Sequence, residues 1–476
     1  MADPAAFARQ KALANAHASK AAPGPTTVGP ATPALGLSKQ GINDTCCAPS
    51  DSTSAVGTTR FLELVNDDIA IYSKTNLTTP IDTESLNALD QTDFGNTFDP
   101  QIIWDPTTKR FYYASDDRES DATDNRIAFG FSKTASPNDA VSSWCHYSIN
   151  YGTEFPDYPK LGDTKDFLLF GTNVFDGGTG GFLRTDAVAV GKPANGPITT
   201  CPSPSSFAFG QKMGLRSKDG SPAWTPVPAN QMDSSSTGYV VASADNIPAT
   251  YLSVFTVKKN SSGAPVFGSA RQLTVPSYST PPDIPQPGTS VKLDSSDTRL
   301  TQAVSAIDPS RGAGTSVAIW TQHTVAGGAG ARVRWYEINP KPATPTLFQS
   351  GKATDSSLYA FDGSISPDRV ANGTTKAFAS NMVLGFDTGS SAQVTHFKVA
   401  SKVGAGAQSA WVDVANSASV MSQNCSGVCR WGDYAAATPD PSASTSGSAG
   451  KVWLTSQLVF STSVFDWATW NVVVKP

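Results

Sequence analysis

An aspartate recurs at similar intervals along this chain, each time opening or immediately preceding a short, strand-like run. The runs begin at Asp99, Asp157, Asp233, Asp297, Asp362 and Asp433, in steps of 58, 76, 64, 65 and 71 residues. A rough period of this length is typical of one small β unit that is used repeatedly. The spacing therefore predicts a radial array of small sheets.

The composition agrees with many short strands. The 476 residues include 39 Gly and 34 Pro, and only 16% of the side chains are charged. Ser and Thr are abundant, as expected for strands with hydroxyl-bearing solvent faces and turns between them. The net charge of −5 provides no basic patch for nucleic acid, and no apolar stretch approaches the roughly 20 residues that cross a bilayer. We therefore expect neither a nucleic-acid partner nor a membrane span.

Strand signals come in groups after residue 57. Phe61–Val65 and Ile69–Tyr72 are joined by a hairpin-like turn, and Ser316–Trp320 is followed by a matching partner at Arg332–Tyr336. No segment after residue 57 keeps an apolar period of 3.6 residues, so the sequence predicts an all-β fold.

Three to four meandering strands per repeat form the blade of a β-propeller. The six aspartate runs and the group starting near Phe61 predict seven blades. If that first group instead completes the last blade, the count is six. We expect ring closure between the N- and C-terminal strands, because closure removes exposed sheet edges. A β-sandwich array is the competing fold, but it does not predict one recurrent inner-strand opening.

Residues 1–57 differ from the remainder. An Ala-rich stretch over 5–20, which suits a helix, precedes a Pro/Gly/Thr-rich stretch over 21–33 that is typical of a linker. Together they predict a poorly ordered leader, linker or tether ahead of a single propeller domain over 58–476. No apolar signal core is present in this stretch. We expect a secreted or cell-surface protein whose export signal has been removed.

The six cysteines favour an oxidising compartment. Cys425 and Cys429 enclose a tight Gly-containing loop and are expected to form a local disulfide. Cys145 and Cys201 flank one repeat and are candidates to pair across it. Cys46 and Cys47 are adjacent, so they bond to each other only with strain, or one remains free.

Ten short motifs, in order along nearly all of residues 58–476, carry a resemblance to a known family. They are Asp99–Pro106, Phe155–Gly162, Asn173–Phe175, Pro285–Thr289, Asp297–Leu300, His323–Val325, Arg334–Glu337, Asp362–Ile365, Arg430–Tyr434 and Asp466–Trp470. With these motifs the chain resembles a family of secreted bacterial β-propellers that is loosely grouped with sialidase-like propellers. Most members have no established activity, so the resemblance implies fold and export rather than a reaction.

A sialidase activity itself is not favoured. The nearest match to the Ser-x-Asp-x-Gly-x-Thr-Trp turn of sialidases, Ser217–Trp224, lacks one spacer and the Thr. Sialidases also require three converging arginines to bind a carboxylate. Arg299, Arg334 and Arg430 are candidates, but nothing in the sequence brings them together. Tyr336 and Glu337 are adjacent in a strand, so they point to opposite faces rather than forming a nucleophile pair.

The aspartates themselves are expected near one mouth of the central channel. A ring of carboxylates there suits a cation or sugar hydroxyls, and two of them suit acid–base cleavage of a glycoside. The simpler interpretation is that each Asp caps a strand by accepting backbone N–H bonds.

The residues that break the repeat are therefore better candidates for chemistry. His323 ends a strand before a Gly-rich loop, where it suits a general base. The catalytic candidates are His323, Arg299, Arg334, Glu337 and Asp433, and the ligand-binding candidates are Arg430, Trp431, Tyr434 and Asp297.

An acidic loop supplies a weak candidate for calcium. Asp116, Asp117 and Asp121 lie close together in the sequence, but the spaced oxygen ligands and central Gly of a known calcium loop are absent. The four well-separated histidines provide no transition-metal spacing. No other cofactor is expected.

Two classes of function follow. The first is an extracellular binding or adhesion propeller that recognises carbohydrate or a cell-surface protein at its mouth. The alternative is a carbohydrate-active enzyme, a glycoside hydrolase or polysaccharide lyase, that acts in the same mouth. At least three of the five catalytic candidates gathered in one open pocket would favour the enzyme.

Overall fold

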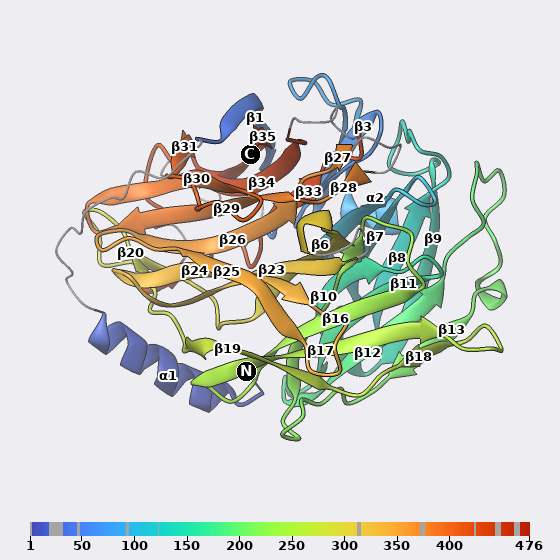
Figure 1. Cartoon of the computed structure of the whole chain (residues 1–476), viewed down its shortest axis with the longest axis horizontal. Coiled ribbons are helices and arrows are strands. Elements are labelled where there is room, and N and C mark those ends of the chain that lie inside the picture. The colour runs from blue at the N-terminus through green and yellow to red at the C-terminus, as the bar shows by residue number, and fades with distance from the viewer. Residues whose placement is uncertain are drawn as a thin grey trace.

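Strands dominate the computed structural model, and Figure 1 shows them grouped into small sheets. The structure describes residues 2–18, 32–44, 48–91, 95–121, 123–311, 316–371, 377–422, 425–442, 449–460 and 467–476.

Seven sheets of four or five strands, here called blades 1 to 7, are formed by the described residues. From the innermost strand outward, blade 1 consists of β2 (Thr53–Val56), β3 (Arg60–Val65), β4 (Asp68–Ser73) and β5 (Asp82–Ser85). Blade 2 consists of β6 (Thr97–Asp105), β7 (Arg110–Arg118), β8 (Asn125–Ser132) and β9 (Trp144–Gly152). Blade 3 consists of β10 (Glu154–Asp163), β11 (Phe167–Asp176), β12 (Phe182–Gly191) and β13 (Phe209–Lys212).

Blades 4 and 5 each have an extra strand. Blade 4 consists of β14 (Ala223–Pro228), β16 (Thr237–Ala244) and β17 (Ala249–Lys259), with β18 (Pro265–Phe267) and β19 (Arg271–Tyr278) both paired to β17. Blade 5 consists of β22 (Leu300–Ile307), β23 (Val317–Gly327), β24 (Gly330–Asn339) and β25 (Thr346–Ala353), and the short β15 (Asn230–Gln231) runs parallel to β22.

Blades 6 and 7 complete the ring. Blade 6 consists of β26 (Tyr359–Pro367), β29 (Asn381–Ser390), β30 (Gln393–Val403) and β31 (Val412–Asn416). Blade 7 consists of β33 (Ala436–Pro439), β34 (Val452–Val459), β35 (Trp467–Lys475) and β1 (Ala34–Asp44).

The innermost strands contact one another in the cyclic order β2, β6, β10, β14, β22, β26, β33 and back to β2. The fold is therefore the predicted β-propeller, with seven blades rather than six. Ring closure is also confirmed, because β1 pairs antiparallel with the C-terminal β35 in blade 7. Figure 1 shows this N-terminal strand in blue beside the red strands near the C-terminus.

Two strands of the ring precede residue 58, where the sequence suggested that the propeller begins. β1 is the outermost strand of blade 7 and β2 is the innermost strand of blade 1. Both lie within the range expected to be leader or linker. The Pro/Gly-rich and Ser/Thr-rich composition of this range hid them, because β1 contains only three large apolar residues.

The blades pack face to face, so both faces of many strands are buried. All ten residues of β29 and all eight of β34 are buried, unlike the alternating pattern of a sheet with one face in solvent. Large side chains fill the space between neighbouring blades; Trp320 and Trp335 of blade 5, for example, belong to one core cluster with Leu384 and Phe386 of blade 6.

A few elements lie outside the blades. They are helices α1 (Pro4–His17) and α2 (Leu86–Asp90), the short helices η1 (Pro204–Ser206) and η2 (Pro309–Arg311), the hairpin of β27 (Val370–Ala371) and β28 (Ala377–Phe378), and a small sheet of β20 (Ile284–Pro285), β21 (Lys292–Leu293) and β32 (Val428–Cys429). Among the described residues, no helix has the length and apolar character needed to cross a membrane.

Both expected disulfides are present. Cys145 of β9 bonds to Cys201, and Cys425 bonds to Cys429. Cys46 and Cys47 lie outside the described residues.

Candidate functional site

The innermost strands of blades 2, 3, 4 and 6 share a bulge close to their first residues, where the register to the second strand shifts. One residue within each bulge has a positive φ: Asp99 (51°), Tyr158 (61°), Thr225 (49°) and Asp362 (45°). The residue that follows is Pro100, Pro159, Pro226 or Gly363. A bulge bends the strand and redirects its side chains. The repeated feature behind the sequence period is therefore a bulge, and aspartate is only one of the residues that occupy it.

Two of the recurrent aspartates do not have the expected position. Asp157 directly precedes the positive-φ residue of its bulge. Asp233 lies after β15, far along the chain from the start of β14 at Ala223, so it opens no innermost strand. Its carboxylate accepts a hydrogen bond from the backbone N–H of Ile307 and pairs with Arg369 (3.1 Å).

The backbone-capping interpretation holds for two of the six recurrent aspartates, because Asp297 accepts the N–H of Arg299 (3.1 Å) and Asp233 accepts that of Ile307. A further aspartate, Asp51 ahead of β2, accepts the N–H of Asp433 (2.7 Å) across the junction of blades 1 and 7. Both carboxylate oxygens of Asp362 are buried and have no hydrogen-bond partner among the described residues. These aspartates are therefore not interchangeable caps.

Innermost strands all begin at one end of the channel, here called the entry face. Charged and aromatic side chains from blades 1, 2, 3, 5 and 7 converge there and form a cluster that we call the mouth. Its members are Asp51, Asp99, Asp116, Asp157, Tyr158, Lys160, Arg299, Arg430, Asp433 and Tyr434.

The outer layer of the mouth holds the most accessible charges. The Arg430 side chain is 57% exposed, and its guanidinium donates to Asp433 (2.6 Å). Arg299 donates through two nitrogens to Asp297 (2.7 and 2.9 Å), and its guanidinium carbon lies 4.5 Å from the centre of the Tyr158 ring. This pairing holds the pKa of Asp297 well below its usual range, although burial alone would raise it.

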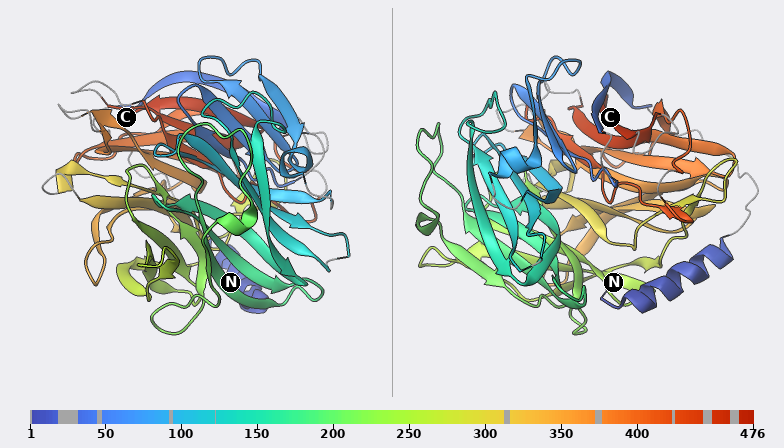
Figure 2. Two further views of the ribbon diagram at one scale, coloured as in Figure 1. Left: turned by 90° about the vertical axis from the view of Figure 1, so that its right-hand side faces the viewer. Right: turned by 180° about the vertical axis from the view of Figure 1, so that it is seen from behind.

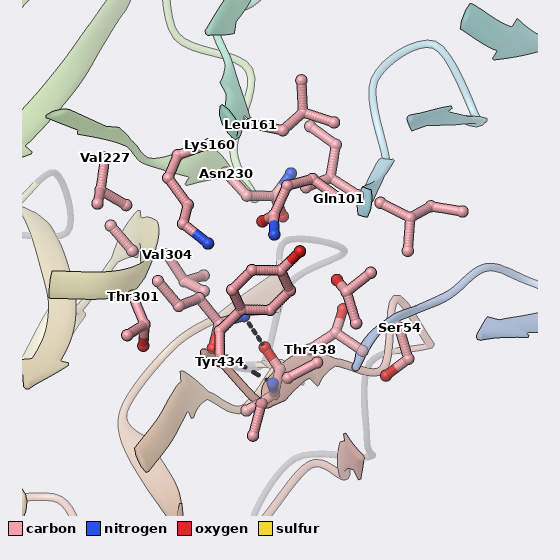
Figure 3. Close-up of a pocket in the computed structure, with 18 residues that line it drawn as sticks. Ser54, Gln101, Lys160, Leu161, Val227, Asn230, Thr301, Val304, Tyr434 and Thr438 are labelled. Carbon is pink, nitrogen blue, oxygen red and sulfur yellow. Dashed lines mark hydrogen bonds between the residues drawn. The ribbon is translucent and has the colours of Figure 1, made fainter. Parts of the chain in front are cut away.

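Lys160 forms the centre of the inner layer. Its ammonium nitrogen is 3.4 Å from the centroid of the Tyr434 ring and 3.7 Å from that of Tyr158, which places the cation against two aromatic faces. Figure 3 shows the ammonium directed toward the Tyr434 ring. The side chain is buried, and its nitrogen makes no hydrogen bond with the described residues. Burial lowers the pKa of Lys160 to about 7, against the attraction of Asp99 and Asp51.

The same burial raises the pKa values of the carboxyl groups around Lys160 toward neutral pH. Burial, with the charge of Asp99 adding to it, raises the pKa of Asp51 to about 7. Burial also raises the pKa values of Asp99 and Asp157 to about 6. Five carboxyl groups therefore share the mouth with three cationic side chains, a concentration of perturbed groups that is typical of functional sites.

Asp99, Asp116 and Asp157 are the closest of these carboxylates. One oxygen of each lies within 4.8 Å of the other two, and within the described ranges this is the one group of His, Cys, Asp or Glu close enough to hold a metal ion. The acidic loop predicted as a calcium candidate does not converge in this way. Asp117 is not part of the group, and Asp121 is exposed and accepts a hydrogen bond from Thr123.

Three of the five catalytic candidates lie outside the mouth. His323 is fully buried and hydrogen-bonds to the carbonyl of Thr298 (2.9 Å) and the hydroxyl of Tyr336 (3.0 Å), and burial lowers its pKa to about 3. Arg334 donates to the carbonyls of Pro276 and Ser277.

Glu337 accepts from Arg311 (2.9 Å) near the end of β24 that is remote from the entry face. Of the five candidates, only Arg299 and Asp433 are brought together.

The ligand-binding candidates divide in the same way. Arg430 is accessible, whereas Trp431, Tyr434 and Asp297 are each at most 2% exposed. Trp431 donates its indole N–H to Asp387 (2.8 Å) and packs against Phe361, so it serves the packing between blades. Tyr434 donates to the carbonyl of Pro100 (2.8 Å) from the inner layer.

Sequence reasoning missed the inner layer of the mouth. Asp51 lies in the range predicted to be leader or linker, and Lys160 and Tyr158 lie in a motif for which the sequence predicts no role. The Tyr-Pro pair after Asp157 matches the Asp-Pro pair at Asp99, and this was the one available signal for a bulge at the same level.

Cavities lie beneath and beside the entry face. A small one of about 30 Å³ lies inside the channel beneath the mouth, between Lys160, Asn230, Thr301 and Tyr434 (Figure 3). It has room for one or two water molecules. A larger one, about 390 Å³, lies between α1 and loops of blades 4 and 5, and its lining includes Leu13, His17, Ile247 and Gly328.

Helix α1 lies against the same face as the mouth. Figure 2 shows it outside the body of strands. The Lys11 ammonium pairs with Asp283 (3.0 Å) and Asp294 (3.2 Å) and donates to Ser295 (2.7 Å) and to the carbonyl of Ser296 (2.9 Å). Because Asp294 and Ser296 also line a cleft with Arg299 and Asp433, the helix adjoins the mouth.

No protein-family model and no curated protein matches this chain. Three solved structures illustrate what it is similar to. An α-L-arabinofuranosidase from Fusarium graminearum is 9% identical over 90% of this chain and 92% of that one, with a TM-score of 0.40. The sialidase of Trypanosoma rangeli is 8% identical over 79% and 54%, with a TM-score of 0.39. An α-L-arabinanase from Penicillium chrysogenum is 13% identical over 80% and 93%, with a TM-score of 0.36. At these values no functional residue is carried over from them to this chain.

Proposed function

We propose that the chain is an extracellular carbohydrate-binding propeller that recognises a neutral glycan at its mouth. The observation that carries this proposal is the convergence of Asp157, Arg299, Arg430 and Asp433, from blades 3, 5 and 7, at the accessible end of the channel. Side chains with carboxylate acceptors and guanidinium donors suit the hydroxyl groups of a sugar, each of which both donates and accepts.

The charge of the mouth favours a neutral ligand over an acidic one. Its five carboxyl groups outnumber Lys160, Arg299 and Arg430. The two arginines already have carboxylate partners in Asp297 and Asp433, and Lys160 is buried. A sialic or uronic acid would bring another negative charge to this cluster, which costs free energy unless a cation is left free to pair with it.

Binding rather than turnover is favoured by the positions of the catalytic candidates. A catalytic centre requires unlike groups within reach of one ligand, and three of the five candidates are engaged in hydrogen bonds elsewhere. Location outside the cell is supported by the two disulfides, which persist in oxidising compartments.

A glycan array that holds neutral, sialylated and uronic-acid glycans tests this proposal, followed by a reducing-end assay on every glycan bound. We expect binding to neutral glycans without release of new reducing ends. Binding confined to acidic glycans, or to none, contradicts the proposal, and release of reducing ends replaces it with the hydrolase alternative.

A further inference from the structure

Three carboxylates of adjacent blades meet at the floor of the mouth. Asp99 belongs to the bulge of β6, Asp116 to β7, directly opposite Phe98 in the ladder, and Asp157 to β10. The bulges of blades 2 and 3 place the two strand openings side by side, so that one oxygen of each carboxylate lies within 4.8 Å of the others.

A second observation indicates that this group has a ligand. Asp116 is 0% exposed, and its Oδ1 has no hydrogen-bond partner among the described residues, while its Oδ2 accepts only a long bond from the Tyr158 N–H (3.3 Å). A buried carboxylate oxygen without a donor is unfavourable. Lys160 does not satisfy it, because its ammonium lies against the Tyr158 and Tyr434 rings and makes no hydrogen bond with the described residues.

The donor set selects the kind of ligand. Oxygen ligands alone suit hard cations, and no imidazole or thiolate of the described residues joins the group. Calcium binds oxygen at about 2.3–2.6 Å, so two oxygens around one ion are up to about 5 Å apart. Magnesium usually keeps several waters and takes only one or two carboxylates, so a group of three carboxylates favours calcium. The three oxygens all lie within 4.8 Å of one another and so satisfy the limit for calcium.

We propose that Asp99, Asp116 and Asp157 form a calcium site at the floor of the mouth. Asp116 and Asp99 are buried, whereas Asp157 is partly exposed and provides the route from solvent. Three protein ligands leave several of the six to eight coordination positions of calcium to water or to a hydroxyl of a bound ligand. The proposed calcium site does not depend on whether the mouth binds a glycan, because the calcium ion itself is the ligand.

The adjacent Lys160 provides an internal check. Its ammonium is buried in the same cluster, and Asp99 is the carboxylate that attracts it most strongly. A positive charge there opposes a second cation. Replacing it with a neutral side chain of similar length is therefore expected to strengthen calcium binding, whereas loss of a carboxylate weakens it.

Calorimetric titration of the whole chain with calcium chloride, after treatment with EDTA, tests this site. We expect one ion per chain with a dissociation constant on the order of 10⁻⁴ to 10⁻³ M, as in extracellular calcium modules. Asp116→Asn and Asp157→Asn should each weaken binding at least about tenfold, and Lys160→Met should strengthen it. Asp121→Asn, in the exposed part of the acidic loop, is the matched control and should leave it unchanged.

Near-UV circular dichroism of each variant establishes that it is folded. If Asp116→Asn does not fold, Asp157→Asn provides the test, because Asp157 is partly exposed. The proposal is overturned if the wild-type chain takes up no calcium at millimolar concentration. It is also overturned if folded Asp157→Asn binds as the wild type does, or if Asp121→Asn alone loses the ion.

Discussion

Lys192 is the clearest case in this propeller of a buried charge that is offset by its neighbours. Its ammonium lies between Asp105 (2.7 Å) and Asp163 (2.5 Å), and all three side chains are at most 2% exposed. Asp163 also accepts the N–H of Gln231, which extends the group from blade 3 toward blade 5. Removing one partner from such a group leaves uncompensated buried charge.

We therefore expect Lys192→Met to lower the free energy of unfolding by about 3–5 kcal/mol. Urea unfolding followed by fluorescence measures this loss. Lys259→Met is the control, because Lys259 pairs with Asp166 on the surface at 45% exposure and such pairs contribute about 0–1 kcal/mol. Equal losses in the two variants would show that burial of the Lys192 group does not matter.

Asp90 predicts a pH dependence of stability. Burial raises its pKa to about 8, with the charge of Asp117 adding to the effect, while the Ser115 hydroxyl donates to one oxygen (2.5 Å). In the unfolded chain the pKa is about 4. The folded state therefore binds the proton more tightly, and this contribution to stability is complete below pH 4 and is lost as the pH rises through 8.

Asp90→Asn removes this group from the titration. Between pH 5 and 8 the free energy of unfolding of the variant should fall less steeply than that of the wild type, by up to roughly 1 kcal/mol per pH unit. Urea unfolding at pH 5, 6, 7 and 8 measures both slopes. Parallel curves would mean that Asp90 is not protonated in the folded chain.

Among single elements, helix α1 depends on polar contacts rather than on a core. None of its residues is buried, and its contacts to the entry face are hydrogen bonds and ion pairs of Gln10, Lys11 and Asn15. Charge-assisted hydrogen bonds of this kind contribute about 1.5–3 kcal/mol. Shortening Lys11, which pairs with Asp283 and Asp294, is therefore expected to make the helix detach from the propeller more often.

Hydrogen exchange of the backbone amides over Pro4–His17 measures that detachment. Lys11→Ala should raise the exchange rates there about tenfold or more, since 1.4 kcal/mol corresponds to a factor of ten. Arg9→Ala is the control, because Arg9 is 70% exposed and lies 4.0 Å from Asp3 of its own helix. Unchanged protection in Lys11→Ala would show that other contacts hold the helix.

For the strands, the sequence predicted which segments form them better than it predicted where they begin and end. The apolar groups at Phe61–Val65 and Ile69–Tyr72 became β3 and β4. β1 was missed because an outermost strand is only partly buried and needs few apolar residues. The bulges were missed because a positive φ is a property of the backbone, and Asp, Tyr and Thr all adopt it here.

For the whole molecule, the repeat predicted the ring, since a period in the sequence becomes a rotation in space. Seven innermost strands in cyclic contact and the pairing of β1 with β35 satisfy that prediction. The mouth was only partly predictable. Asp433, Arg299 and Arg430 were named from motifs, but Asp51 and Lys160 join them from blades 1 and 3, and such convergence depends on the closed ring rather than on local sequence.

We propose the mouth as the place where the glycan ligand binds. The direct test is a binding titration of the best array glycan against the wild type, Arg430→Ala and Arg216→Ala. Arg430 is accessible in the mouth, and Arg216 is an exposed arginine bonded to Gly220 in its own turn. We predict that Arg430→Ala weakens binding at least about tenfold, the effect of losing a charged hydrogen bond, while Arg216→Ala binds as the wild type does. Undiminished binding by Arg430→Ala would contradict the claim and place the ligand elsewhere on the propeller.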